Sequence, residues 1–216
     1  MRFLIFLILS TSSFAQQYDS FQGKLVYTIE MADTALQKYI PTRTMIVYTN
    51  DTIVRIENET GQLGKQVVIK HTLLNKSILL LQSGETKYAI QTDLAKENTS
   101  PESDSTKPSY TYKKKFGKRK VLNLKANRME VSLKGQKKSL EILYLKNISP
   151  KYIDAYKELP GLPVRYYLNT DDGVVVYTLV YMEKTVVNRD LFGIPSDYKK
   201  VSFDQFMDEI MQPVKE

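Results

Sequence analysis

Apolar and polar residues alternate with a period of two near the start of the chain, and strand-like runs follow. From residue 21 to residue 31, most odd positions are apolar and most even positions are polar. This pattern is typical of a strand with one buried face. Short strand-like runs separated by turn residues predict an antiparallel meander, and they follow at residues 44–48, 52–57, 66–71, 77–82 and 86–91. Residues 78–81 are all apolar, so we expect this strand to be covered on both faces.

The strand pattern continues beyond a polar segment at residues 97–109. This segment contains Glu, Asn, Thr, Ser, Pro, Asp and Lys but no large apolar side chain. We interpret it as a flexible loop inserted in one sheet, because strand patterns of the same style resume after it. These patterns lie at residues 128–133, 139–146, 164–168 and 174–185.

Two helices are predicted in the second half of the chain. Ser149 can cap a helix that starts at Pro150, and this helix must be short because a segment rich in Pro and Gly begins at Leu159. Further on, Ser202 and Gln205 have the spacing of a capping box, and an apolar helical stripe follows. The stripe consists of Phe203, Phe206, Met207, Ile210 and Met211. The fold class is therefore mainly β, with a short helix after Ser149 and a C-terminal amphipathic helix.

Residues 1–15 have the features of a secretory signal peptide. Arg2 precedes an apolar run at residues 3–9, and small residues follow up to Ala15. The run is too short to cross a bilayer as a helix, so we expect a cleaved signal and a protein that does not span the membrane. Residues 16–216 then form a single exported domain in the periplasm or outside the cell.

Charge and cysteine content exclude several classes of site. The chain has 31 Lys and Arg against 24 Asp and Glu, a net charge of +7. This excess favours anionic surfaces such as lipid headgroups and is no evidence for nucleic-acid binding in an exported protein. The absence of cysteine rules out disulfides, zinc-thiolate sites and cysteine nucleophiles. The single histidine, His71, continues an apolar strand pattern and lacks a partner for metal binding or catalysis. We expect no enzyme activity, no cofactor and no metal.

Two segments resemble exported bacterial families of unknown function with a LolA-like fold. Residues 158–164, with the sequence ELPGLPV, look like the Gly-Leu-Pro segment that precedes a strand in the GLPGLI-like group. Residues 192–201 look like the closing tail of these families. The resemblance to the LolA–LolB-like superfamily extends from about Phe21 to Phe206. It implies a strongly curved antiparallel sheet, a half-barrel closed on its concave face by short helices and loops. No functional residue of LolA matches closely enough to be transferred.

A half-barrel of this kind offers a ligand site on its concave face. Related members bind lipid-like ligands, and an apolar, partly filled cavity would hold a lipid or another hydrophobic molecule. The candidate lining residues are Tyr152, Tyr156, Leu162, Val164 and Tyr166. In the alternative interpretation the core is filled, and the protein is a structural or interaction module of the cell envelope.

A basic run at residues 113–120 is the second candidate site. Its cationic residues, which we expect in a hairpin, are Lys113, Lys114, Lys115, Lys118, Arg119 and Lys120. They could dock onto an anionic envelope surface or an acidic protein partner. Alternatively, they protect an exposed edge strand from pairing with other chains.

Overall fold

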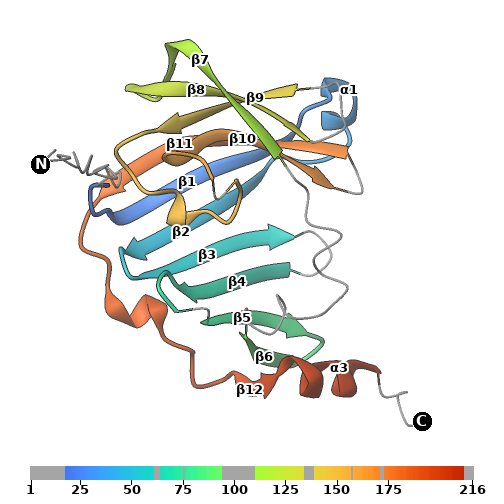
Figure 1. The fold of residues 1–216 in the computed structure, drawn as a ribbon. Coiled ribbons are helices and arrows are strands. Elements are labelled where there is room, and N and C mark those ends of the chain that lie inside the picture. Colours follow the sequence, from blue (N-terminus) through green and yellow to red (C-terminus); the bar gives the residue numbers. More distant parts are fainter. Residues whose placement is uncertain are drawn as a thin grey trace, which may run out of the picture.

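Twelve strands form one curved sheet that does not close on itself (Figure 1). The structure is a computed structural model, and it describes residues 18–60, 64–74, 76–93, 110–133, 139–156, 158–170 and 173–211. The predicted signal peptide at residues 1–15 and the predicted loop at residues 97–109 lie outside the described residues. The mainly β fold class is confirmed.

The strands match the period-two pattern of the sequence closely. They are β1 (Gln22–Met31), β2 (Arg43–Asn50), β3 (Ile53–Thr60), β4 (Gly64–His71), β5 (Lys76–Ser83), β6 (Thr86–Asp93), β7 (Tyr110–Val121), β8 (Leu124–Leu133), β9 (Ser139–Leu145), β10 (Leu162–Thr170), β11 (Gly173–Lys184) and β12 (Lys199–Ser202). Their order across the sheet is β12-β6-β5-β4-β3-β2-β1-β11-β10-β9-β8-β7.

Two antiparallel meanders share this sheet and are joined by pairing of β1 with β11. The strands β7 and β12 therefore lie at its two edges. All neighbours pair antiparallel except β12, which runs parallel to β6 with Val201 opposite Ile90. The predicted meander did not include β12, because its four residues show no alternating pattern of their own.

Short helices connect and cover the strands. They are α1 (Thr34–Gln37), the 3₁₀ helices η1 (Pro150–Tyr152) and η2 (Arg189–Phe192), and α3 (Phe203–Met211). The two predicted helices are confirmed: the Ser149 side chain caps η1, and Ser202 and Gln205 exchange capping-box hydrogen bonds at the start of α3. Because η1 is a single 3₁₀ turn, Tyr156 lies beyond its end.

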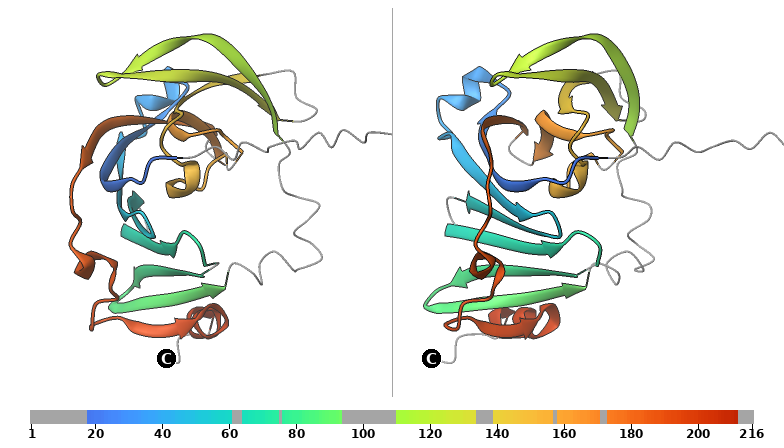
Figure 2. Two further views of the ribbon diagram at one scale, coloured as in Figure 1. Left: turned by 60° about the vertical axis from the view of Figure 1, so that its left-hand side comes forward. Right: turned by 90° about the vertical axis from the view of Figure 1, so that its left-hand side faces the viewer.

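The main hydrophobic core lies on the concave side of the sheet, which we call the inner face. Odd-numbered residues of β1, such as Leu25 and Tyr27, point into this core, and Phe21 just before the strand also belongs to it. The segment between β9 and β10, which contains η1, packs inside the curve of the sheet (Figure 2). Burial of this segment fills much of the concavity around β1, β10 and β11.

The apolar run at residues 78–81 predicts cover on both faces of β5, but the cover is unequal: Leu80 on the outer face is buried, whereas Leu79 and Leu81 on the inner face are only partly buried. Leu80 packs on the outer face with Val67 and Ala89, against the segment that follows η2. Leu79 points to the inner face and belongs to a cluster with Ile90 and α3. The C-terminal part of the chain thus runs along the outer face before α3 reaches the other side (Figure 2).

Candidate functional site

An apolar strip extends the inner face from the core onto β4, β5 and β6. Strand register places Ile56, Val68, Leu79 and Ile90 opposite one another across four neighbouring strands. Ile56 and Ile90 are buried, whereas Val68 and Leu79 are only partly buried. The inner face therefore keeps accessible apolar surface where the segment around η1 does not cover it.

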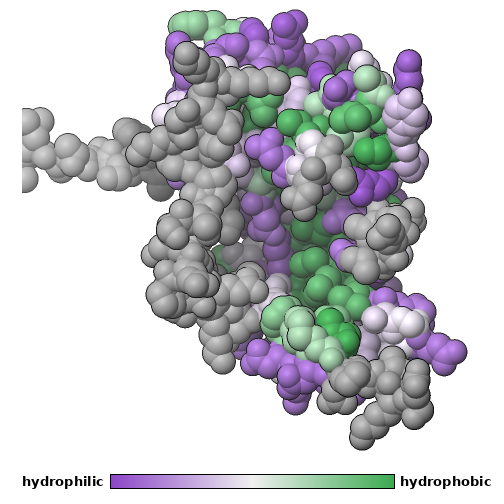
Figure 3. Space-filling view, turned by 90° about the vertical axis from the view of Figure 1, so that its right-hand side faces the viewer, coloured by the Kyte–Doolittle hydropathy of each residue, from purple (hydrophilic) through white to green (hydrophobic). Residues whose placement is uncertain are grey.

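The helix α3 borders this strip on the side of β6. The Phe206 ring contacts the Tyr88 ring edge-on, with the ring centroids 5.2 Å apart. Leu81, two residues beyond Leu79, is also partly buried and packs in the same cluster. We call Val68, Leu79, Leu81 and Phe206 the inner strip. Viewed from the right-hand side of Figure 1, hydrophobic residues form a band in a hollow between hydrophilic ones (Figure 3).

Two polar atoms on the inner face have no hydrogen-bond partner among the described residues. They are Arg43 Nε and Asn58 Oδ1, and both atoms are buried. Asn58 lies opposite Met45, a core residue on the inner face, and Arg43 precedes Met45 by two positions on the same face of β2. Buried polar atoms are normally paired, so these two are exceptions on the inner face.

The five residues predicted to line a cavity come together, but as tightly packed core. Tyr152, Tyr156, Leu162, Val164 and Tyr166 are each at most 9% exposed. The Tyr166 ring contacts the Tyr27 ring at 6.0 Å and the Tyr156 ring at 6.4 Å between centroids. Burial raises the pKa of the Tyr152, Tyr156 and Tyr166 hydroxyls, so they stay protonated. Their placement gives a ligand little direct access to these side chains.

A polar network fixes the η1 segment across one end of the inner face. Lys151 Nζ lies 2.7 Å from Asp51 Oδ1 in the turn between β2 and β3, and the Tyr152 hydroxyl donates to the same carboxylate. Burial alone would raise the pKa of Asp51, but the hydrogen bonds from Lys151 and Tyr152 lower it. The carboxylate therefore stays ionised, and this end of the inner face is closed by charged contacts.

The single histidine stabilises the turn after β4, beside this network. His71 Nδ1 accepts hydrogen bonds from the backbone N–H groups of Leu73 and Leu74, both at 3.2 Å. His71 also lines a small pocket of about 440 Å³ with Lys70, Asp154 and other residues. Among the residues that the structure describes, no cluster of His, Asp or Glu is arranged to hold a metal ion.

The predicted basic run lies in the edge strand β7, which forms a hairpin with β8. The turn to β8 lies further on, at Leu122, and Phe116 and Gly117 form a bulge in the pairing of β7 with β8. Residues 113–120 are exposed, and the Phe116 side chain is 99% exposed. Edge position and high charge agree with both interpretations of the run, docking and protection of the edge.

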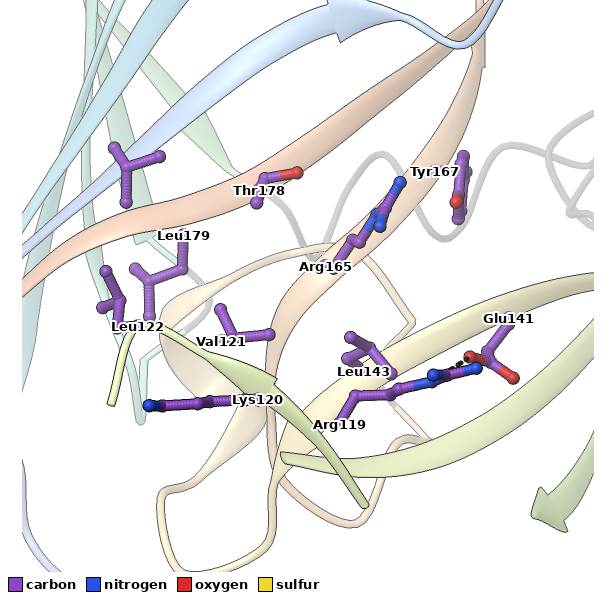
Figure 4. Close-up of a pocket in the computed structure, with 11 residues that line it drawn as sticks. Arg119, Lys120, Val121, Leu122, Glu141, Leu143, Arg165, Tyr167, Thr178 and Leu179 are labelled. Atoms are coloured by element: carbon purple, nitrogen blue, oxygen red, sulfur yellow. Dashed lines mark ion pairs between the residues drawn. The ribbon is translucent and has the colours of Figure 1, made fainter. Parts of the chain in front are cut away.

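The end of β7 contributes to a pocket of about 620 Å³ with β9, β10 and β11 (Figure 4). We call it the outer pocket, because Arg165 and Tyr167 alternate with the core residues Val164 and Tyr166 along β10 and therefore point to the opposite face. The outer pocket is lined by Arg119, Lys120, Val121, Leu122, Glu141, Leu143, Arg165, Tyr167, Thr178, Leu179 and Val180. Sequence analysis singled out only Arg119 and Lys120 of this set.

The comparisons with known proteins support the fold and no more. No family model matches the chain, and no curated protein matches it in sequence. Twelve chains of solved structures match, among them the structure of PNGF-II in space group C2, with 14% sequence identity and a TM-score of 0.53. The match covers 89% of this chain but 33% of the PNGF-II chain, so this chain spans about one third of that length. None of the helices in the described parts of the chain is long and apolar enough to cross a membrane.

Proposed function

We propose that this protein is an exported, non-enzymatic binding protein that holds a hydrophobic ligand on the inner face of a LolA-like half-barrel. The observation that carries the proposal is the inner strip, where Val68, Leu79 and Leu81 are only partly buried on the concave side of the sheet. Apolar surface in a concave site is stabilised by binding an apolar molecule, since burial removes it from water.

The unpaired atoms Arg43 Nε and Asn58 Oδ1 suit a ligand with a polar head and an apolar body. Arg43 can donate to an oxygen of the head, and Asn58 can accept from a hydroxyl or an N–H group. The apolar body would then lie along the inner strip. Such a ligand is an amphiphile of the lipid class, which supports the ligand class expected from the sequence.

An alternative function has one observation in its favour. The close packing of Tyr152, Tyr156 and Tyr166 fits a structural or interaction module whose core is filled. Such a module would act through the basic edge strand β7 and would need no small ligand. The two functions differ in what the inner strip does, which gives a direct test.

The test measures binding of the neutral fluorescent probe N-phenyl-1-naphthylamine to protein purified without detergent. We expect binding by the natural chain and at least a tenfold loss of affinity in Leu79→Glu and Leu81→Glu, because a carboxylate on the inner strip opposes apolar contact. Leu73→Glu is the matched control, since Leu73 is 78% exposed in the turn after β4. Thermal unfolding of each variant shows that the fold is intact.

A result in which the natural chain binds no probe, or in which all three variants bind it equally, would overturn the inner-face site. Organic extraction and mass spectrometry of the same protein identify any ligand that copurifies. Cell fractionation of the natural host tests export separately, because binding and location are independent parts of the proposal.

A further inference from the structure

The outer pocket has a charged end and an apolar end. Figure 4 shows Arg119 and Arg165 on either side of Leu143, with Arg119 extending toward Glu141 and Arg165 toward Tyr167, whereas Val121, Leu122 and Leu179 lie at the other end. Lys120 points away from both arginines but borders the same pocket. Cationic and apolar groups from β7, β9, β10 and β11 are thus combined in one site, with Arg165 and Tyr167 on the face opposite the inner strip.

The positive charge of the charged end is largely free to bind an external anion. Arg165 is exposed and forms no ion pair with a described residue. The pocket's carboxylate, Glu141, is held by Arg128, with Nη2 and Nε of Arg128 at 2.6 and 3.1 Å. Arg119 reaches Glu141 only at 3.9 Å, and Lys115 only at 3.7 Å.

Glu141 therefore pairs closely with Arg128 and only at long range with Arg119, and it forms no ion pair with Arg165 among the described residues. The hydrogen bonds from Arg128 lower the pKa of Glu141, which stays ionised and directed at Arg128. Arg119 and Arg165 present planar groups with several N–H donors, the geometry that phosphate oxygens prefer.

The apolar end of the pocket indicates that the ligand has an apolar part as well as an anionic group. Leu122 and Val180 are 40% and 41% exposed, beside the buried residues Leu143 and Leu179. A free inorganic anion would gain nothing from these side chains. A phosphate group attached to an apolar chain would contact both ends of the pocket at once.

We infer that the outer pocket binds the phosphate headgroup of an anionic phospholipid in a membrane surface. The phosphate lies between Arg119 and Arg165, and the first carbons of the acyl chains contact Leu122 and Val180. The exposed lysines of β7, such as Lys113 and Lys114, add long-range attraction to the anionic surface. This inference does not depend on the proposed inner-face ligand, because the two sites lie on opposite faces of the sheet.

The experiment is cosedimentation of the protein with vesicles of phosphatidylglycerol and phosphatidylcholine, compared with pure phosphatidylcholine, at about 0.1 M salt. The pocket variant carries Arg119→Gln and Arg165→Gln. Its matched control carries Lys113→Gln and Lys114→Gln, which removes the same charge from β7 outside the pocket. All four side chains are exposed, and thermal unfolding checks that both variants keep the fold.

We expect binding that requires phosphatidylglycerol, a loss of at least tenfold in the pocket variant and a loss of no more than about threefold in the control. Val180→Ser should weaken vesicle binding without changing charge. Equal losses in the pocket and control variants would show diffuse attraction by the basic strand and overturn the inference. Displacement of the protein from vesicles by millimolar inorganic phosphate at constant ionic strength would equally overturn it, since it would indicate a site for the free anion.

Discussion

Lys70 on β4 forms an ion pair with Asp154, which follows η1, with 2.6 Å between Nζ and Oδ1. The Lys70 side chain is 8% exposed, whereas the Asp154 side chain is 61% exposed. The pair connects the sheet to the segment that closes one end of the inner face. It therefore links the stability of that closure to the Asp154 carboxylate.

We predict that Asp154→Asn lowers the free energy of unfolding by about 1 kcal/mol, because the mostly buried Lys70 ammonium group loses its ion pair with Asp154. Urea unfolding measures the change. The control is Asp197→Asn, which breaks the exposed ion pair between Lys87 and Asp197, 2.7 Å long. That variant should lose no more than about 0.5 kcal/mol, since exposed pairs contribute little. Equal losses in both variants would contradict a special role for Lys70.

The two ion pairs of Glu57 on β3 lead us to predict that the protein loses stability in acid. Burial alone would raise its pKa, but hydrogen bonds from Lys65 and Arg55 outweigh it and lower the pKa below the ordinary 4.5. Arg55 Nε lies 2.6 Å and Lys65 Nζ 2.8 Å from the two carboxylate oxygens. Because the pKa of Glu57 is lower in the folded protein than in the unfolded chain, the ionised carboxylate stabilises the fold at pH values above the unfolded-state pKa. The stabilisation is lost as the pH falls from about 4.5 through the lower folded-state value.

Glu57→Gln removes this titration, so the stability of the variant should fall less steeply below pH 4.5 than that of the natural chain. Urea unfolding at several pH values between about 3 and 7 measures the slopes. The backbone carbonyl of Leu191, at the outer-face segment, accepts from Arg55 Nη1 at 2.9 Å and should keep Arg55 in place in the variant. Parallel pH profiles for the two proteins would show that Glu57 titrates normally.

Sequence periodicity predicts where the strands lie better than it predicts which strands pair with one another. Local alternation is sufficient to recognise a strand such as β1, because its buried face repeats every second residue. It cannot reveal that β12 pairs with β6, since that contact joins distant parts of the chain and β12 has one buried residue, Val201. Pairing partners of short strands depend on the whole fold.

For the candidate sites, too, the sequence predicts local features but not the contacts that depend on the whole fold. The sequence grouped Tyr152, Tyr156 and Tyr166 correctly, but their burial depends on rings that other strands bring, such as Tyr27 and Tyr110. The inner strip has a signal in the sequence, the apolar run at residues 78–81, which includes Leu79 and Leu81. The outer pocket has none, because β8 and β9 separate β7 from β10 in the sheet, and only the complete fold places Arg119 and Arg165 around one pocket.

Gly161 stands where the backbone passes very close to β9. A Cβ atom added at this position would lie 2.1 Å from the carbonyl oxygen of Leu145. Gly161→Ala should therefore destabilise the protein by about 2 kcal/mol or more, since the backbone must shift to accept the methyl group. Gly193→Ala is the control, because its added Cβ would lie 3.3 Å from the nearest backbone oxygen. Thermal unfolding measures both, and an unchanged melting temperature for Gly161→Ala would refute the close approach.

The capping box of α3 stabilises the helix that covers the inner strip beside β6. Ser202 Oγ accepts from the Gln205 backbone N–H at 3.2 Å, and Gln205 Oε1 accepts from the Ser202 N–H at 2.9 Å. Ser202→Ala removes one of these bonds and should destabilise the helix by about 1 kcal/mol. Because Phe206 is the α3 residue that packs on Tyr88, loosening α3 exposes the inner strip next to β6.

We therefore predict faster amide hydrogen exchange in α3 and β12 of Ser202→Ala, with unchanged exchange in β1 and β11. Ser202→Thr keeps a hydroxyl that can cap the helix and should restore slow exchange. If exchange in α3 is already as fast in the natural chain as in Ser202→Ala, the capping box does not hold the helix in solution. In that case the inner strip is more open than the contact between Phe206 and Tyr88 indicates, and probe binding should be insensitive to the cap.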